Sequence, residues 1–183
     1  MKIYFLSSNE HKITEVRKIL SSDKIEVLAF SNKINEIQSE DMHAIARDKV
    51  IKAYKIIARP VFVEQTGLLI KKFGNLPGGL TQIFWDSLQA DKFSEFFAKD
   101  EGTATIAKTV LAYCDGRKVY TFEGEIKGDI INPPRGNREF QWDCVFQPDG
   151  YDKTFAELGK KKNQISMRKI ALERLKEFLR EQE

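Results

Sequence analysis

Residues 2–20 have the sequence KIYFLSSNEHKITEVRKIL, an apolar run followed by a polar turn and an amphipathic segment. Lys2–Leu6 is short and apolar, which predicts a core strand. Glu10–Leu20 carries apolar residues at positions 13, 16, 19 and 20, the spacing of a helix with one buried face. The stretch therefore predicts a strand, a tight polar turn and a helix.

The next forty residues continue this alternation. Ile25–Phe30 predicts a second strand, Asp41–Ile57 a second helix and Val61–Val63 the start of a third strand. A β-α-β-α-β order is typical of a sheet covered by helices. We therefore expect the α/β class, with a mixed central sheet and flanking helices.

The remainder of the chain predicts shorter elements separated by turns. They are a strand at Leu68–Phe73, a loop at 74–79, two short helices within Ile83–Phe97, a hairpin of Thr103–Tyr113 and Lys118–Ile126 with an Asp-Gly turn at 115–116, a loop at 132–136, a strand at Cys144–Phe146 and a helix at Ser166–Arg180. We expect one domain over residues 1–183, with its sheet in two lobes and the site in a cleft between them.

The composition narrows the classes of function. The 30 basic residues nearly match the 27 acidic ones, so the net charge of +3 does not favour a nucleic-acid partner. No run of about 18 apolar residues is present, so we expect no membrane span. Cys114 and Cys144 lie in apolar runs and are expected to be free, buried thiols, which fits a reducing cytoplasm.

The turn between the first strand and helix suits an anion. Ser7, Ser8 and Asn9 leave backbone N–H groups pointing outward, the helix N-terminus adds partial positive charge, and Lys12 adds a full one. These features predict a phosphate site. The alternative is an ordinary helix start, with Asn9 as the N-cap and Lys12 in solvent.

Two carboxylates are candidate magnesium ligands. Glu64 follows the apolar run at 61–63, so we expect it at the carboxyl end of a buried strand, where α/β proteins place ligands. Glu36, in a loop before the second helix, could join it, because Mg²⁺ takes few carboxylates together with phosphate oxygens and water. The alternative for Glu36 is a solvated loop charge.

A third group of side chains lies near the end of the chain. Phe140, Trp142 and Tyr151 offer flat faces, and Asp143 could accept hydrogen bonds from a base. Aromatic residues in such a region can equally belong to the core. Lys162 and Arg168 offer cations for phosphate or a base oxygen. With Ser166 as N-cap, Arg168 falls in the first turn of the last helix, where a cation opposes the helix dipole, so we expect it to have another task.

In these segments the chain resembles the inosine triphosphate pyrophosphatase family over about Lys2 to Phe178. The family patterns T-G-N-x-x-K, E-D-[ST]-G-L, P-G, G-[WY]-D-P-x-F and K-N-x-[IV]-S-H-R correspond to residues 7–12, 64–68, 77–78, 141–146 and 162–168, and residues 147–158 are nearly unmodified. The combined order of these motifs is far more specific than any one of them.

The resemblance implies hydrolysis of ITP, dITP and XTP to the monophosphate and pyrophosphate, with Mg²⁺, by a homodimer. Glu64 would orient the attacking water through the metal, and Glu36 would bind the metal with it. The residues that the resemblance assigns to the substrate are Ser7, Ser8, Asn9, Lys12, Lys49 and Thr66 on the phosphate side, and Phe140, Gln141, Trp142, Asp143, Lys162, Met167 and Arg168 on the base side.

Two departures from the family pattern bear on this activity. The aspartate of E-D-[ST]-G-L is Gln65, and an amide cannot take up a proton near neutral pH. The histidine of S-H-R is Met167, which cannot donate a hydrogen bond to a base. The first hypothesis is therefore a pyrophosphatase with altered specificity, and the alternative is a weakened homologue that binds nucleotides as a sensor or sink. The candidate dimer face is formed by Leu80, Ile83, Phe84 and Trp85.

Overall fold

The computed structural model describes residues 1–21, 25–98 and 103–182. Its strands are β1 (Lys2–Leu6), β2 (Glu26–Phe30), β3 (Val61–Ile70), β4 (Pro77–Gly78), β5 (Thr103–Cys114), β6 (Val119–Ile130) and β7 (Phe146–Pro148). Its helices are α1 (Glu10–Leu20), α2 (Met42–Ile57), α3 (Thr81–Phe97), α4 (Phe155–Leu158), α5 (Lys162–Ile165) and α6 (Met167–Glu181), with 3₁₀ turns η1 (Lys71–Phe73), η2 (Gln141–Cys144) and η3 (Gly159–Lys161).

The strands form one mixed sheet, as the sequence predicts. Its order is β2-β1-β3-β5-β6-β7, with β4 paired to β3. β1 runs parallel to β2 and β3, because helices connect these strands, whereas β3, β5, β6 and β7 pair antiparallel. The Asp-Gly hairpin between β5 and β6 is confirmed, and Gly116 takes the positive φ of +100° that its turn requires.

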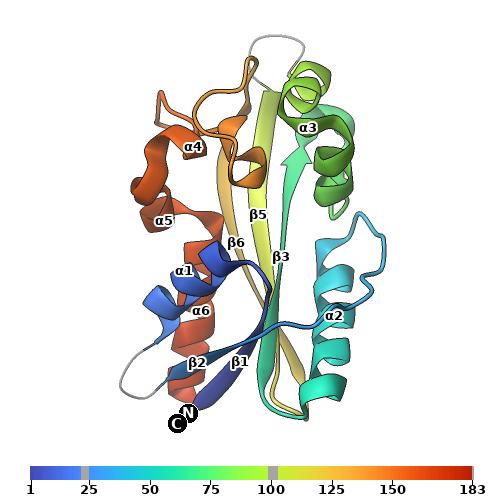
Figure 1. Cartoon of the computed structure of the whole chain (residues 1–183), viewed down its shortest axis with the longest axis vertical. Coiled ribbons are helices and arrows are strands. Elements are labelled where there is room, and N and C mark those ends of the chain that lie inside the picture. Colours follow the sequence, from blue (N-terminus) through green and yellow to red (C-terminus); the bar gives the residue numbers. More distant parts are fainter. Residues whose placement is uncertain (22–24, 99–102, 183) are drawn as a thin grey trace.

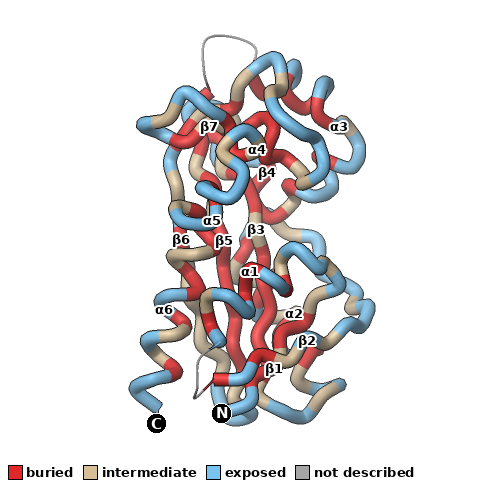
Figure 2. Tube along the Cα trace, turned by 60° about the vertical axis from the view of Figure 1, so that its left-hand side comes forward, coloured by how far each residue is buried: buried red, intermediate tan, exposed pale blue. Residues whose placement is uncertain are grey.

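Helices cover both faces of the sheet (Figure 1). α1 and α6 pack on one face around Phe62 and Leu111, and α2 packs on the other around Val61 and Val63. The side chains alternate along β3 because successive residues of a strand point to opposite faces. A tube coloured by burial shows β3 and β5, in the middle of the sheet, as largely buried, whereas β6 is mostly of intermediate burial (Figure 2).

The long strands β3, β5 and β6 run through both halves of the molecule (Figure 1). In the half beyond α1, α3 and the segment from η2 to α5 enclose a second core, which contains Phe93, Trp142, Phe146 and Phe155. The expected two-lobed mixed sheet is therefore present. Helix α3 bends at Gln89, where φ is +56°, which confirms the expectation of two short helices in this region.

Several predicted boundaries are wrong. β3 continues without a break to Ile70, so Glu64 lies inside a strand and not at its end, and residues 71–73 are a 3₁₀ turn. The last short strand is Phe146–Pro148 where 144–146 was expected, and β6 extends to Ile130. Residues 155–165, in which no helix was expected, form α4, η3 and α5. Within the described ranges, no helix combines the length and apolarity needed to cross a bilayer.

Candidate functional site

The first turn of α1 is an ordered helix start. Asn9 has extended backbone angles, and its Oδ1 accepts a hydrogen bond from the Lys12 N–H at 3.1 Å. The Oγ of Ser7 accepts a hydrogen bond from the Asn9 N–H at 3.2 Å. Asn9 is thus the N-cap, but Lys12 is not a solvated surface charge, because its side chain is only 17% exposed and turns toward β3.

Glu64 is the buried anion that Lys12 meets. The Lys12 Nζ lies 3.0 Å from Glu64 Oε1, and the Thr66 hydroxyl donates to the same oxygen at 2.9 Å. Arg168 binds both oxygens, with Nε 2.6 Å from Oε2 and Nη2 3.0 Å from Oε1. Burial opposes ionisation of Glu64, but Arg168 and Lys12 outweigh it and hold the pKa of this carboxyl well below its usual range.

Arg168 joins three elements of the fold. Its Nη1 lies 2.6 Å from Oε2 of Glu15 on α1, while its other nitrogens reach Glu64 on β3. The Ser166 Oγ caps α6 by accepting from the Lys169 N–H, which fixes Arg168 in the first turn. α6 can approach β6 so closely because Gly124 has no side chain; a Cβ there would lie 2.1 Å from the Met167 carbonyl oxygen. The carboxylates of Glu15 and Glu64 thus explain why a cation, Arg168, lies in the first turn of α6, where the helix dipole is unfavourable to it.

A polar cavity of about 340 Å³ opens beside this cluster. Predicted site residues form much of its wall: Ser7, Ser8, Asn9, Lys12, Glu36, Lys49, Glu64 and Gln141. Lys33 also lines it, so the wall carries three lysines and two carboxylates. The Lys49 Nζ is 2.5 Å from Glu36 Oε1, and no cation of the described residues pairs with the second oxygen of Glu36. This mixture of lysine charge and N-terminal helix charge suits an anion with bound metal.

A second cavity of about 410 Å³ lies between α1 and the segment from Asn137 to α5. The predicted residues Phe140, Asp143, Lys162 and Arg168 line it. The Lys162 Nζ is 2.5 Å from Asp143 Oδ2 and 4.2 Å from the centre of the Phe140 ring. Burial lowers the pKa of the Lys162 ammonium and raises the pKa of the Asp143 carboxyl, while each charge stabilises the other. An aromatic face beside polar groups suits a flat heterocycle.

The first turn of α1 separates these two cavities. Lys12 lines the first cavity, and its neighbour His11 lines the second. Consecutive helical residues point about 100° apart, so one turn can serve two compartments. The ion pair between Arg168 and Glu64 also joins the two cavities, because Glu64 lines the first cavity and Arg168 lines the second. A molecule with a flat ring and an anionic tail could therefore span the turn.

Four predicted site residues line neither cavity: Gln65, Thr66, Trp142 and Met167. Gln65 points to the other face of β3, where its Nε2 donates to the Gly79 carbonyl oxygen at 3.4 Å. Trp142 packs against Phe146 and Phe155, and Met167 is 1% exposed within the same core. Thr66 donates a hydrogen bond from its hydroxyl to the Glu64 carboxylate. Any direct role of these four in binding stays a prediction.

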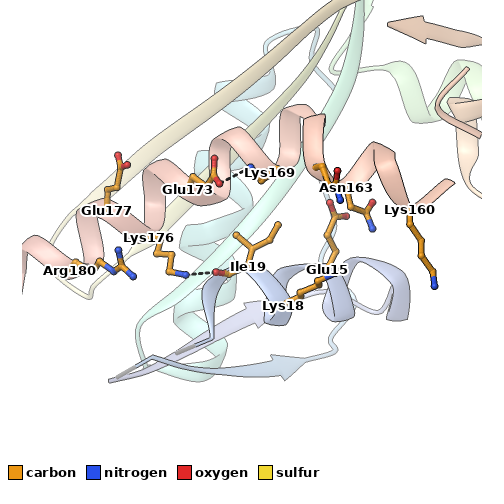
Figure 3. Close-up of a pocket in the computed structure, with 11 residues that line it drawn as sticks. Glu15, Lys18, Ile19, Lys160, Asn163, Lys169, Glu173, Lys176, Glu177 and Arg180 are labelled. Atoms are coloured by element: carbon orange, nitrogen blue, oxygen red, sulfur yellow. Dashed lines mark hydrogen bonds and ion pairs between the residues drawn. The ribbon is translucent and has the colours of Figure 1, made fainter. Parts of the chain in front are cut away.

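A third cavity, of about 680 Å³ and larger than the other two, has none of the predicted site residues in its lining. It lies between α1 and α6, and Figure 3 shows charged side chains along its walls. Two of its lysines already have partners, because Lys169 pairs with Glu173 at 2.8 Å and the Lys176 ammonium donates to the Ile19 carbonyl oxygen at 2.7 Å. The kinds of residue that line a cavity, and not the volume of the cavity, therefore identify the site.

The number of available carboxylates limits how the site could bind a metal ion. Among the described residues, no group of three or more histidine, cysteine, aspartate or glutamate side chains is placed to hold an ion. Glu64 already accepts from Lys12, Thr66 and Arg168. Glu36, whose side chain is 37% exposed at the edge of the first cavity, retains a free oxygen. One carboxylate beside phosphate oxygens and water is a donor set that fits Mg²⁺.

Two residues that this geometry brings to the site were not among the predicted site residues. Glu15 is buried and binds Arg168, and His11 faces the ring of Phe140 edge-on at 6.2 Å between centroids. Glu15 gave a signal in the sequence, since it lies three residues after Lys12 and next to the inward-facing Val16. His11 gave none, because an exposed histidine in a first helical turn is ordinary.

A model of the Ham1 family matches residues 3–178. The chain belongs to the Ham1 family. It is 37% identical to a protein of Yarrowia lipolytica named inosine triphosphate pyrophosphatase, with 99% of this chain and 97% of that protein covered. It is 33% identical to a dITP/XTP pyrophosphatase of Saccharolobus solfataricus, covering 98% and 94% of the two chains.

Solved structures agree on the fold. A HAM1 protein from Coxiella burnetii superposes with a TM-score of 0.84 at 23% identity, over 99% of both chains. The Staphylococcus aureus Ham1 protein gives 0.77 at 22% identity over the whole of both chains. The family resemblance predicted from the motifs is thereby confirmed, together with the mixed α/β fold.

Proposed function

We propose that this chain hydrolyses nucleoside triphosphates with non-standard purine bases, such as ITP, dITP and XTP, to the monophosphate and pyrophosphate. The observation that carries the proposal is the division of the site by α1, with Lys12 in a polar cavity on one side and Phe140 in a partly aromatic cavity on the other. The names of the relatives in Yarrowia lipolytica and Saccharolobus solfataricus support the same substrate class.

In this proposal the first cavity holds the triphosphate. The N–H groups before α1 and the Lys12 and Lys49 ammonium groups bind its oxygens and orient the chain for in-line attack. Burial lowers the pKa of Lys12, although Glu64 opposes that shift, and an incoming phosphate would favour its charged form. The charge that develops on the departing pyrophosphate is stabilised by the same cations.

Glu36 is the residue that we propose for Mg²⁺ in this site, and the ion would neutralise phosphate charge and polarise the phosphorus–oxygen bonds. Glu64 then has a different role from the one that the family motif implies, which is to orient the attacking water through the metal. Its carboxylate fixes Lys12 and Arg168 at the floor shared by the two cavities. Water attacks the α-phosphorus and releases a proton to solvent, the bond to the oxygen that bridges the α- and β-phosphorus breaks, and pyrophosphate leaves with that oxygen.

The second cavity holds the base. Phe140 offers a ring face, although Lys162 already lies over it at 4.2 Å, and Asp143 can accept from a ring N–H. Arg168 has two N–H groups beyond the three that its carboxylates use, so it can also donate to an oxo oxygen. These groups favour a base that presents oxygen where adenine presents an amino group.

A substrate panel tests the proposal. Folded protein is incubated with Mg²⁺ and ITP, dITP, XTP, ATP or GTP, and pyrophosphate is measured. We expect the three non-standard nucleotides to be hydrolysed at least tenfold faster than ATP and GTP, since buried polar groups in such a site discriminate strongly. Tight binding of ITP by calorimetry without turnover would instead favour the weakened, nucleotide-binding alternative.

We further propose that the chain forms a homodimer in the cytoplasm. Ile83 is 45% and Phe96 is 48% exposed on α3, and Leu80 and Phe84 are half-buried beside them. Trp85 is buried against Phe93, so its expected place on this face is wrong. Cys114 and Cys144 are free and buried, which is compatible with a reducing compartment.

A further inference from the structure

His11 is placed to contact whatever occupies the second cavity. It lies in the first turn of α1, is exposed, and stands perpendicular to the Phe140 ring at an interplanar angle of 84°. Neither nitrogen of its ring has a hydrogen-bond partner within the described part of the chain. A neutral imidazole carries one donor and one acceptor, so His11 has both to offer a ligand.

The buried charged groups beside Phe140 already have partners. The Lys162 ammonium binds Asp143, and three nitrogens of Arg168 bind Glu15 and Glu64. Lys18 and Lys160 line the cavity too, but they also form the wall of the groove between α1 and α6 and so lie toward that side. His11 therefore adds a donor at the Phe140 ring to the two N–H groups that Arg168 retains.

The position of Met167 adds to this argument. The family motif has a histidine there, whereas this chain has a thioether that cannot donate and that packs in the core. An imidazole is thus absent from the α6 side of the site and present on the α1 side. His11 lines the second cavity, whereas Met167 is buried in the core and is not part of its wall.

We propose that His11 determines base specificity by donating an imidazole N–H to the exocyclic oxygen of a 6-oxo purine that lies against Phe140. This inference rests on the proposed function and names a residue that reads the base. A 6-amino group presents a donor at the same place, and the imidazole must then turn its acceptor nitrogen inward. The discrimination is consequently modest, about fivefold to tenfold, as one neutral hydrogen bond provides.

The test compares three variants with the wild type. His11→Phe keeps an aromatic ring but removes both nitrogens, His11→Gln keeps a donor, and His43→Phe alters the only other histidine, which lines neither cavity. The value of kcat/KM is measured for ITP and for ATP with Mg²⁺. We expect the ITP-to-ATP ratio to fall about fivefold to tenfold in His11→Phe, chiefly through KM for ITP, and to remain within about twofold in the other two.

Inhibition by tripolyphosphate provides the internal control, because it has phosphates but no base. Its inhibition constant should be the same in His11→Phe and the wild type. An unchanged ratio in His11→Phe, or an equal loss with ITP and ATP, overturns the inference while leaving the proposed function intact. If the wild type hydrolyses neither nucleotide, the proposed function fails, and the ratio of their dissociation constants by calorimetry then tests His11 in the same variants.

Discussion

Arg168 and Glu64 form a two-point ion pair across the floor of the site, with distances of 2.6 Å and 3.0 Å between their nitrogen and oxygen atoms. The two residues are 104 positions apart in the chain, and both side chains are 2% exposed. The pair joins α6 to the middle of β3 and places one member in each cavity. The fold thereby fixes the phosphate side of the site relative to the base side.

Removing the cation should destabilise the protein strongly. Arg168→Met leaves Glu64 and Glu15 buried without their main partner, and loss of one member of a buried pair costs about 3–5 kcal/mol. The matched control is Lys169→Met, next in the chain, which removes only a surface pair with Glu173 and should cost less than about 1 kcal/mol. Urea denaturation of both variants measures the difference, and equal stabilities would contradict the structural role given to Arg168.

The stability of the protein should depend on pH through Glu64. The folded-state pKa of this carboxyl is depressed, so its contribution is complete above the unfolded-state pKa of about 4.3 and is lost as the pH falls toward the folded value. We expect the free energy of unfolding to decline between about pH 5 and pH 2, and to decline less steeply in Glu64→Gln. Parallel pH profiles for the two proteins would show that Glu64 does not carry this dependence.

Gln65 offers a direct test of how much the missing aspartate matters. Its amide donates to the Gly79 carbonyl oxygen and does not line the first cavity. We therefore expect Gln65→Asp to change kcat/KM for ITP by less than about threefold, whereas restoring a needed general base would raise it by about 10²-fold or more. Gln65→Asn serves as the control for the shortened side chain, and a large gain confined to the aspartate variant would refute our placement of residue 65.

Glu36 should control the magnesium requirement. Glu36→Gln keeps the shape of the side chain but removes the carboxylate charge, which pairs with Lys49 at the edge of the first cavity. We expect the Mg²⁺ concentration for half-maximal activity to rise about tenfold or more. Glu40→Gln, in the same loop and exposed, should leave it unchanged. An equal metal requirement in all three proteins would remove Glu36 from the metal site.

The exposed face of α3 should hold the dimer together. Phe96→Glu places a charge among exposed apolar side chains, so we expect light scattering to report a monomer in place of a dimer. Ile51→Glu changes a residue of similar exposure on α2 and should leave the mass unchanged. A wild-type protein that is monomeric at every concentration tested would exclude the proposed assembly.

The local patterns in the sequence predicted the sheet and its main helices well, because apolar spacing reports local burial. Together with the family motifs, they identified eight of the thirteen residues that line the first cavity, but only four of the fifteen that line the second. The continuation of β3 through Glu64 was missed because acidic and amide side chains inside a strand resemble the start of a turn. The pairing of β3 with β5 along its whole length, with β1 and β4 at its two ends, keeps that segment extended.

The pairing of distant charges could not be predicted in this way. Nothing local to Glu15 indicates Arg168, which lies 153 positions away, and the two meet only because α1 and α6 pack on the same face of the sheet. The burial of Met167 follows from the same packing, since Gly124 lets α6 approach β6. The sequence motifs identified the candidate site residues, and the tertiary fold determines which of these residues line the cavities.

The most direct test of the account is to identify the products formed from ITP and Mg²⁺ by phosphorus NMR. Attack at the phosphorus nearest the ribose should yield one inosine monophosphate and one pyrophosphate for each ITP consumed, and Lys12→Met should lower the rate by about 10²-fold or more as phosphate binding and charge stabilisation are lost. Release of inosine diphosphate and inorganic phosphate, or persistence of intact ITP with well-folded protein, would contradict the proposed reaction.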